Sequence, residues 1–348
     1  MNVSQVQLEH LFKEFAKLKV LILGDVMVDS YIWGKVDRIS PEAPVPVVLV
    51  NRRSNMLGGA ANVALNIKSL GAEPILCSVI GNDLRGNDFI ELLENDDIST
   101  KGIIQSTGRI TTTKFRIIGN KTQLLRVDEE TDSDLDELEL KTLKDKLVEI
   151  LADQKIDVII LQDYNKGVLT ADVIAHIIAL GKEKGIPVVV DPKKKNFSLY
   201  RRVDLLKPNL KELAEGLKME FKASDLSKIN EACIEWQRKQ EITSLMVTLS
   251  ERGVYMREEV NGATKEFHIP AHVRNIADVS GAGDTVISVA SLCRALRVDT
   301  ELTAALANIA GGLVCEHVGV VPVSGKMLLM EAKSLLSSDK NAKRNSVK

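Results

Sequence analysis

Two aspartates on either side of a nearly bare turn are the residues of this sequence best suited to do chemistry. Asp278 and Asp284 flank the tripeptide Gly281-Ala282-Gly283, and the apolar run TVISVASLCRAL follows with helical spacing. Successive backbone N–H groups in such a turn bind anions, and a helix N-terminus favours negative charge. Asp284 is therefore expected in the first turn of a helix, either as a base beside a bound anion or as a simple helix cap.

A glycine pair in the N-terminal third raises the same question. Gly58 and Gly59 open the string GGAANVALN, a predicted helix start whose first turn carries Asn62. Small residues at this place could simply let a strand and a helix pack tightly. They could equally bring backbone amides and the Asn62 amide against the hydroxyls of a sugar. By itself the motif is a weak signal, and both alternatives stay open.

Short apolar runs that alternate with helical patterns predict the elements that position these residues. The runs expected to be strands are 19–25, 73–81, 156–163, 186–192, 203–209 and 244–250. The segments expected to be helices are 58–71, 83–96, 134–153, 170–184, 209–217 and 224–240. Such strands indicate an α/β fold with a mostly parallel sheet covered on both faces. Ligands bind at the carboxyl ends of parallel strands, where the sequence places Asp25, Asp163, Asp191, Asn209 and Ser250.

Residues 31–57 and 109–130 break this pattern, because they are rich in β-branched residues and turns and poor in helical spacing. The string PEAPVPVV in the first of them excludes a place at the centre of a sheet, since proline has no N–H to donate. We expect these segments to form a small β-sheet lid inserted into the α/β body. Residues 1–336 are thus expected to form one domain, and the polar residues 337–348 a disordered tail.

Composition and charge exclude several classes of protein. The chain has 348 residues, 45% hydrophobic and 27% charged, with a net charge of −2. These are values of a globular protein, and no basic face indicates nucleic-acid binding. No apolar run approaches the roughly 20 residues of a membrane span, and the N-terminus lacks signal-peptide features, so we expect a cytoplasmic protein. The cysteines are far apart and form no CxxC pair, which favours buried, reduced thiols.

Together the two glycine motifs are more informative than either alone. A glycine pair followed by Asn, and the late string DVSGAGDT, resemble in order and separation the two signatures of the ribokinase-like (PfkB) carbohydrate kinases. The resemblance extends from about Lys19 to about Leu335 and implies a three-layer α/β sandwich with a β-sheet lid. Further strings, such as RISPEAPVPVV, DYNKGVL, VDPKKKNF and KPNLKE, resemble the branch of the family that phosphorylates O1 of D-glycero-β-D-manno-heptose 7-phosphate for lipopolysaccharide core synthesis.

The resemblance implies a role for each matching residue of the two signatures. Asp284 would take the proton from the sugar's anomeric hydroxyl as that oxygen attacks the γ-phosphate of ATP. The backbone amides expected to bind the transferred phosphoryl group are those of Gly281, Ala282 and Gly283. The positions that match sugar-hydroxyl contacts are Asp25, Gly58, Gly59 and Asn62.

The resemblance also implies a metal site and a nucleotide site. Asn209 and Glu212 match the family's Asn-x-x-Glu element beside Mg²⁺ and the phosphates, and Mg²⁺ prefers such oxygen ligands. The alternative for Glu212 is an ordinary residue at the start of a helix. The residues expected on the ATP side are Thr248, Ser250, Gly253, Asn308, Gly311 and Gly312. Some family members also bind K⁺ beside the late signature.

The phosphate that the expected sugar already carries requires cations, because Arg and Lys are the usual phosphate ligands. The candidates are Lys193, Lys166, Lys114, Arg116 and Arg126. Lys193 is favoured among them because it follows a strand end in the predicted cleft. For each of these residues, Lys193 included, a solvated surface charge is the alternative.

Two other interpretations remain: a kinase for another sugar or sugar phosphate, and a non-catalytic sensor of sugar phosphates. Asp284 and the glycines before it are intact, which disfavours the sensor. The strands of the lid favour a homodimer formed through the lid, and neither nucleic acid nor a membrane is expected as a partner. The sequence contains no His-x-Gly-His string, the signature of the nucleotidyltransferase domain of bifunctional relatives. We therefore expect nucleotidyl transfer to belong to a separate protein.

Overall fold

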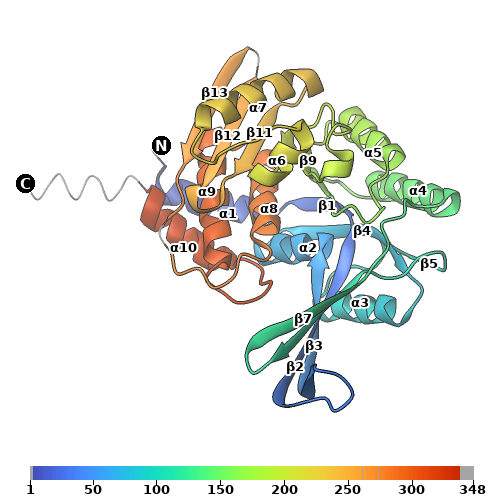
Figure 1. Ribbon diagram of the computed structural model, residues 1–348. Helices are drawn as coiled ribbons and strands as arrows, with labels where there is room; N and C mark the ends of the chain where they lie inside the picture. Colours follow the sequence, from blue (N-terminus) through green and yellow to red (C-terminus); the bar gives the residue numbers. More distant parts are fainter. Residues whose placement is uncertain (1–2, 261, 273, 338–348) are drawn as a thin grey trace, which may run out of the picture.

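The computed structural model describes residues 3–260, 262–272 and 274–337, and its body is built on one nine-stranded sheet (Figure 1). The strands lie in the order β13-β12-β11-β10-β9-β8-β1-β4-β5. Their bounds are β1 Lys19–Gly24, β4 Glu73–Gly81, β5 Ile103–Ser106, β8 Val158–Gln162, β9 Val188–Asp191, β10 Leu205–Leu206, β11 Ser244–Thr248, β12 Val254–Val260 and β13 Ala263–Ile269. Neighbours from β5 to β11 are parallel, and β12 and β13 add an antiparallel hairpin at one edge. The predicted α/β fold is confirmed.

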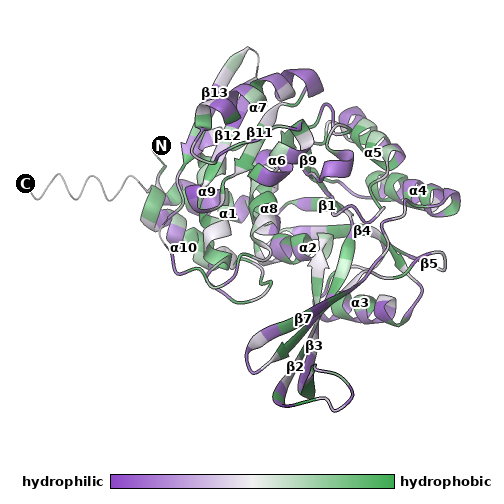
Figure 2. Cartoon of the chain, in the orientation of Figure 1, coloured by the Kyte–Doolittle hydropathy of each residue, from purple (hydrophilic) through white to green (hydrophobic). Residues whose placement is uncertain are grey.

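Helices cover both faces of this sheet, because its strands are apolar on both sides. Val20 and Ile22 of β1 belong to one hydrophobic cluster, whereas Leu21 and Leu23 belong to a second. The first cluster contains residues of α1 (Gln5–Phe15), α2 (Ala60–Ser69), α3 (Leu84–Asn95), α8 (Ala282–Ala295), α9 (Thr300–Val314) and α10 (Gly325–Leu336). The second contains residues of α4 (Glu137–Asp153), α5 (Ala171–Lys184), α6 (Leu210–Leu217) and α7 (Leu226–Gln240). Hydrophilic and hydrophobic residues alternate around α4 and α5 (Figure 2), as in helices with one buried face.

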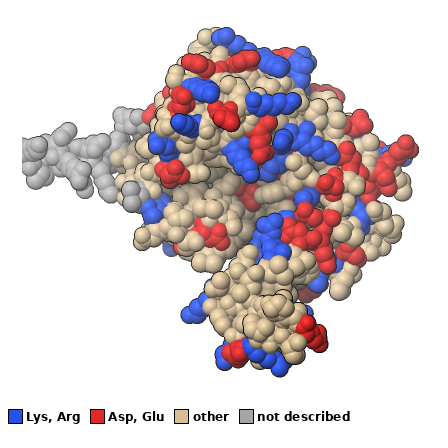
Figure 3. Space-filling view, in the orientation of Figure 1, with Lys and Arg blue, Asp and Glu red and all other residues tan. Residues whose placement is uncertain are grey.

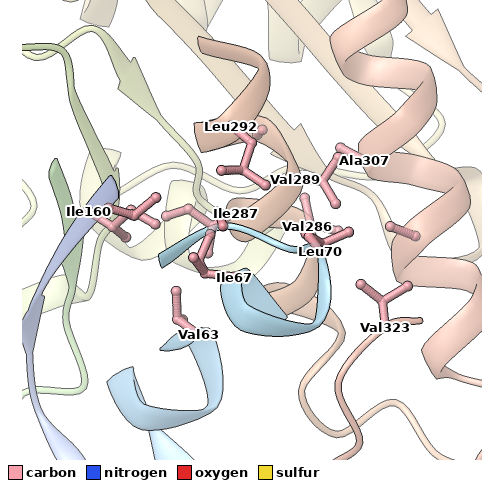
Figure 4. Close-up of a cluster of buried hydrophobic side chains, with 14 of the residues drawn as sticks. Val63, Ile67, Leu70, Ile160, Val286, Ile287, Val289, Leu292, Ala307 and Val323 are labelled. Atoms are coloured by element: carbon pink, nitrogen blue, oxygen red, sulfur yellow. The ribbon is translucent and has the colours of Figure 1, made fainter. Parts of the chain in front are cut away.

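The packing of α2 against α8 brings the two glycine motifs together. Val63 and Ile67 of α2 lie in one buried cluster with Ile287 of α8 (Figure 4). A buried hydrogen bond reinforces this contact, since the hydroxyl of Thr285 donates to Oδ1 of Asn66 at 2.9 Å. Segments 219 residues apart in the chain are thereby held side by side.

The lid is a second sheet of four strands that projects from the body (Figure 1) in the order β3-β2-β6-β7. Its strands are β2 Val26–Ile39, β3 Pro46–Gly59, β6 Thr113–Gly119 and β7 Thr122–Glu129. β2 pairs antiparallel with β3 and parallel with β6. The predicted lid is therefore present, but it begins at residue 26 and not at 31, because β2 follows β1 almost without a break and no turn marks the boundary.

Other predicted bounds were also inexact. The run 203–209 forms only the two-residue strand β10, because Pro208 has no N–H to extend the ladder and Asn209 already begins α6. The β12–β13 hairpin was not predicted. Of the expected tail, Ser337 forms a parallel bridge with Val3, and residues 338–348 lie outside the described residues.

The four cysteines are buried, as expected. Burial raises the pKa of Cys77, Cys233 and Cys293 to about 12, so these thiols stay protonated at neutral pH and are poor nucleophiles. Over the part of the chain that the structure describes, no helix has both the length and the apolar character that a membrane crossing requires.

Candidate active site

The late glycine motif forms the N-terminus of α8, as predicted. Gly281 precedes the helix with a φ of 79°, a left-handed conformation that glycine adopts without strain. A Cβ at this position would also lie 3.0 Å from Nδ2 of Asn62 and 3.2 Å from Cγ1 of Val320. Among the described residues no side chain caps this helix. The N–H of Ala282, one of the amides expected to bind the phosphoryl group, donates instead to the carbonyl oxygen of Val279 at 3.3 Å. The anion site at this helix start therefore depends on the N–H groups that follow, beginning with that of Gly283.

Asp278, at the other end of the motif, orders the turn that leads into α8. Its Oδ1 accepts hydrogen bonds from the backbone N–H and the hydroxyl of Ser280, at 3.0 and 2.8 Å. Its Oδ2 accepts the N–H of Gly319 at 3.0 Å. The two aspartates of the motif therefore have different surroundings and different roles.

Asp284 lies in the first turn of α8 but does not cap it. Its Oδ2 accepts a hydrogen bond from Nδ2 of Asn62 at 2.7 Å. Its Oδ1 accepts two, from Nε2 of Gln162 at 3.1 Å and from the hydroxyl of Tyr164 at 2.7 Å. The helix-cap alternative for this side chain is thus wrong. A carboxylate oxygen accepts about two hydrogen bonds, so Oδ2 has room for one more donor and Oδ1 has none.

The surroundings of Asp284 give its carboxyl group a pKa suited to a general base. Burial raises this pKa to about 6, while the hydrogen bonds from Asn62 and Tyr164 oppose that rise. The charge of Asp191 raises it as well, and the charge of Lys207 lowers it. At neutral pH the carboxylate is therefore mostly ionised and yet basic enough to accept a proton.

Two lysines place positive charge beside the N-terminus of α8. Lys207 is 2% exposed and pairs with Asp191 at 3.0 Å, and its Nζ would lie 3.7 Å from a Cβ at Gly283. Lys193 pairs with Glu212. Although burial disfavours its charged form, the charges of Asp191 and Glu212 raise the pKa of Lys193. Fixed cations at this place can stabilise negative charge that develops during a reaction.

Asn209 and Glu212, expected beside Mg²⁺, form a capping box at the start of α6. Oδ1 of Asn209 accepts the N–H of Glu212, and Oε2 of Glu212 accepts the N–H of Asn209, both at 2.8 Å. The helix-start alternative is therefore realised in this structure. The other oxygen of Glu212 pairs with Lys193. The metal role of both residues stays a prediction.

The oxygen atoms at this place fit a Mg²⁺ ion that keeps water ligands. Oδ1 of Asp191 is buried and has no hydrogen-bond partner in the described part of the chain. The described residues include no group of three or more His, Cys, Asp or Glu side chains able to hold a metal by themselves. Mg²⁺ commonly binds through one or two carboxylates together with substrate phosphates, and Oδ1 of Asp191 is one carboxylate oxygen suited to that mode.

Asp25, expected to bind a sugar hydroxyl, holds the loop that follows β8. It is 1% exposed. Its Oδ2 accepts the N–H groups of Tyr164 and Lys166 at 2.8 and 3.1 Å, and its Oδ1 accepts that of Val168 at 3.0 Å. Burial and then the charge of Asp163 raise the pKa of Asp25 to about 6. With three backbone bonds to maintain, this carboxylate is foremost a structural anchor, and its sugar contact stays a prediction.

Asp29, close to Asp25 in the sequence GDVMVD, lies on the lid, where the sequence patterns did not indicate it. Asp29 of β2 pairs with Arg116 at 2.5 Å and would lie 2.7 Å from a Cβ at Gly58. A Cβ at Gly59, whose φ is 61°, would approach the carbonyl oxygen of Asp25 to 2.5 Å. Close packing therefore accounts for both glycines, and their sugar contacts stay predictions.

Gln162 and Tyr164, which contact Asp284, were not predicted either, although Asp163 between them was singled out. Successive strand residues point to opposite faces. Oδ2 of Asp163 accordingly lies on the other side, accepting hydrogen bonds from the hydroxyl of Tyr200 at 2.7 Å and from Asn196 at 3.0 Å. The alternation at the end of β8 was the signal that could have identified its two neighbours.

The cations predicted for the substrate phosphate all have carboxylate partners. Lys166 contacts Glu130 at 2.7 Å, and Lys114 contacts Glu130 at 3.0 Å and Asp128 at 3.1 Å. Arg126 contacts Asp128 at 2.9 Å and is half-exposed. Lys and Arg side chains gather at the edge of the hollow between the lid and the body (Figure 3). Which of these cations meet a phosphate stays a prediction.

Three residues predicted on the ATP side lie where β11 ends. Thr248 is the last residue of β11, and Ser250 and Gly253 bound the short turn into β12. Gly253 has a φ of 88°, and a Cβ there would collide with the carbonyl oxygen of Ile269. The backbone conformation at position 253 therefore requires glycine, whether or not a nucleotide binds beside it.

Asn308 and Gly311, also predicted on the ATP side, lie on α9. Nδ2 of Asn308 donates to the carbonyl oxygen of Pro270 at 2.9 Å. A Cβ at Gly311 would lie 2.8 Å from Cγ2 of Val286, so this glycine lets α9 pack closely on α8. The adjacent Gly312 faces Arg274. The nucleotide contacts of these residues stay predictions.

A parallel α/β body, a β lid and a buried aspartate at an uncapped helix N-terminus define the class of the ribokinase-like sugar kinases. The chain belongs to the pfkB family of carbohydrate kinases, since the profile described as pfkB family carbohydrate kinase matches residues 17–324. The protein is therefore a sugar kinase, of a class that uses ATP and a divalent metal ion.

Curated relatives cover most of the chain. The bifunctional protein HldE of Geotalea uraniireducens is 36% identical over 332 residues, which are 94% of this chain and 66% of that protein. The bifunctional protein HldE of Helicobacter pylori is 40% identical over 303 residues, 86% of this chain and 63% of that protein. The chain thus spans less than two thirds of the length of these relatives.

Solved structures show the same fold. Phosphofructokinase-2 from Escherichia coli, in complex with substrates and products, aligns with a TM-score of 0.74 at 18% identity, covering 92% of this chain and 99% of that chain. Ribokinase from Arabidopsis thaliana, complexed with ribose and ATP, aligns with a TM-score of 0.66 at 16% identity, covering 90% and 98%. At such identities the likeness establishes the fold alone.

Proposed function

We propose that the protein transfers the γ-phosphate of ATP to O1 of D-glycero-β-D-manno-heptose 7-phosphate, yielding heptose 1,7-bisphosphate and ADP. The observation that supports this most is the setting of Asp284, which is buried at the uncapped N-terminus of α8 and oriented by three hydrogen-bond donors. The choice of sugar rests on the heptose-kinase strings in the sequence. Such a reaction belongs to ADP-heptose and lipopolysaccharide core synthesis in the cytoplasm.

In this reaction Oδ2 of Asp284 accepts the proton of the anomeric hydroxyl, because Oδ1 already holds two hydrogen bonds. The N–H groups at the start of α8 stabilise the charge on the transferred phosphoryl group. Each such donor contributes about 3–4 kcal/mol in measured cases. Asp191 and Glu212 would hold a Mg²⁺ ion, which would supply positive charge to the phosphates of the nucleotide. Lys207 adds fixed positive charge nearby.

The 7-phosphate of the sugar would bind cations at the junction of lid and body. Lys193 is the first candidate, and it must exchange its contact with Glu212 for one with the phosphate. Lys166 and Arg116 are the next, and each is paired with a carboxylate in the structure. Like-charge repulsion from these carboxylates would oppose a phosphate unless the cations outnumber them. A Lys193→Met variant is thus expected to raise KM for the sugar phosphate more than KM for ATP.

The experiment that tests the substrate is ATP turnover with heptose 7-phosphate compared with fructose, ribose and fructose 6-phosphate. Heptose without its phosphate is the matched control, because it isolates the contribution of the 7-phosphate. We expect the largest kcat/KM for heptose 7-phosphate. Turnover confined to the other three sugars would refute the heptose assignment and favour a pfkB kinase for another sugar. No turnover with any sugar, together with tight sugar-phosphate binding, would favour the sensor.

A homodimer through the lid is proposed as the assembly. Leu49 on β3 and Leu125 on β7 are 70% and 54% exposed, and burying such side chains would contribute about 1.5–3 kcal/mol each. The Leu49→Lys and Leu125→Lys variants are expected to dissociate the dimer in sedimentation experiments. Leu138→Lys, at an exposed leucine of α4, is the matched control. A monomeric parent protein would contradict the proposal.

A further inference from the structure

The loop 163–168, which follows β8, joins the lid to Asp284. Near its start, the hydroxyl of Tyr164 donates to Oδ1 of Asp284 at 2.7 Å. Two residues later, Nζ of Lys166 contacts the carboxylate of Glu130 at 2.7 Å. Glu130 directly follows the lid strand β7. One short segment therefore contacts the base at one place and the lid at another.

The backbone of this loop is fixed by hydrogen bonds. Asp25 accepts three of its N–H groups. In addition, a guanidinium N–H of Arg109 donates to the carbonyl oxygen of Lys166 at 2.6 Å. Gly167 has a φ of 88°, and a Cβ there would collide with neighbouring backbone. The loop thus has little freedom to deform internally, so a displacement of the Lys166 backbone would shift Tyr164 as well.

The lid acts on this loop through a small ion-pair network. The carboxylate of Glu130 forms ion pairs with Nζ of Lys166 and with Nζ of Lys114 on β6, the latter at 3.0 Å. Lys114 contacts Asp128 of β7 as well, at 3.1 Å. The side chains of Lys114, Lys166 and Glu130 are 16%, 19% and 27% exposed. Partly buried pairs are screened less by water and salt than surface pairs, so both strands of the lid hairpin are coupled to the loop.

On the basis of the kinase function proposed above, we propose that Tyr164 is a positioning residue for Asp284. The Glu130–Lys166 ion pair makes the hydrogen bond between Tyr164 and Asp284 depend on the position of the lid. With Oδ1 held by Tyr164 and Gln162, the plane of the carboxylate is fixed and Oδ2 is left for the proton of the sugar. A lid that moves away draws Glu130 from Lys166 and loosens this arrangement. The base is then oriented best when the lid is in place.

The hydroxyl of Tyr164 is a donor over the whole working range of pH. Burial first, and then the charges of Asp284 and Asp191, raise the pKa of this phenol well above its usual value. The other groups that face the Asp284 carboxylate, all unchanged in a Tyr164→Phe variant, are Asn62, Gln162, Asp191, Lys207 and Lys193. A change in that variant therefore reports the loss of one hydrogen bond.

The test compares Tyr164→Phe, Glu130→Gln and the double variant in steady-state kinetics. Tyr164→Phe is expected to lower kcat about 10- to 100-fold, the cost of a misplaced catalytic group, with KM for ATP unchanged. The acid limb of its pH–rate profile should move to higher pH, because a hydrogen bond that favours the ionised carboxylate is lost. Glu130→Gln should lower kcat less, and the double variant should be no slower than Tyr164→Phe alone.

Lys195→Met is the matched control, because Lys195 also pairs with a carboxylate, Asp134 at 2.7 Å, but on an exposed surface. Its kcat should equal that of the parent protein. An unchanged kcat and pH profile in Tyr164→Phe would overturn the positioning role. Losses that multiply in the double variant would overturn the coupling to the lid.

A second measurement separates this inference from the identity of the sugar. Thermal unfolding of Tyr164→Phe, Asp284→Asn and their double variant needs no substrate, and residues in contact are expected to give Tm shifts that do not add. Additive shifts overturn the inference whichever sugar is phosphorylated. Non-additive shifts without turnover of heptose 7-phosphate support the inference and overturn only the substrate assignment.

Discussion

Replacing Asp284 by Asn should inactivate the enzyme and at the same time change how its stability depends on pH. Asn keeps the size of the side chain but cannot ionise or accept the proton of a sugar hydroxyl. Loss of a general base typically lowers kcat by about 10²- to 10⁴-fold. The stability effect follows from the raised pKa of the parent carboxyl group, which is about 6 in the folded protein against about 3.9 in an unfolded chain.

The magnitude and sign follow from proton linkage. A difference of about two pKa units corresponds to about 3 kcal/mol. Below about pH 3 the carboxyl group is mostly protonated in both the folded and the unfolded state and costs little. As the pH rises towards 6, the unfolded chain releases this proton first, so the parent protein loses up to about 3 kcal/mol of unfolding free energy relative to Asp284→Asn. Above pH 7 the difference is constant.

The assay is denaturant unfolding of both proteins between pH 4 and pH 8, evaluated as the difference in unfolding free energy. Asp25, whose pKa is raised in the same way, is present in both proteins and cancels. In thermal scans the same change amounts to roughly 4 °C for a chain of this size. A difference that stays constant within about 1 kcal/mol over this range would refute the proposal that burial controls the charge of Asp284.

Three further variants test separate parts of the site. Gly283→Ala should keep or slightly raise stability, by up to about 1 kcal/mol, because the nearest atom to the new Cβ, Nζ of Lys207, lies 3.7 Å away. The kcat of this variant should fall, since the methyl group crowds the phosphoryl position. An unchanged kcat would contradict the anion-site interpretation. Lys207→Met should cost about 3–5 kcal/mol of unfolding free energy by leaving Asp191 buried without its cation, and adding Asp191→Asn should recover part of this loss. Gly253→Ala should lower the unfolding free energy by about 1–3 kcal/mol through backbone strain, and should lower Tm equally in the presence and absence of ATP. A loss of stability that appears only with ATP would argue for a nucleotide contact.

Local patterns in the sequence were sufficient for the fold class and for the place of Asp284. Uninterrupted apolar runs predict strands that are buried on both faces, and β1 confirms it with alternate residues in two clusters. The lid was indicated by prolines and β-branched residues, because these exclude helix and central-strand positions. A glycine followed by a helical apolar run places Asp284 in the first turn of α8. These features depend on residues that are close together in the chain.

The partners of each polar side chain were decided by the tertiary structure alone. The donors to Asp284 come from positions 222, 122 and 120 residues away in the chain, and no local pattern encodes such contacts. The same holds for Asp25 and Asp29 of the string GDVMVD. Asp25 anchors the loop after β8 because that loop packs beside it, whereas Asp29 pairs with Arg116 within the lid. The motif DVSGAGDT thus specified by itself a glycine turn and a helix start. Whether its last aspartate caps that helix or serves as a base was determined by packing, because α2 and β8 bring their donors to the carboxylate and the helix N–H groups do not.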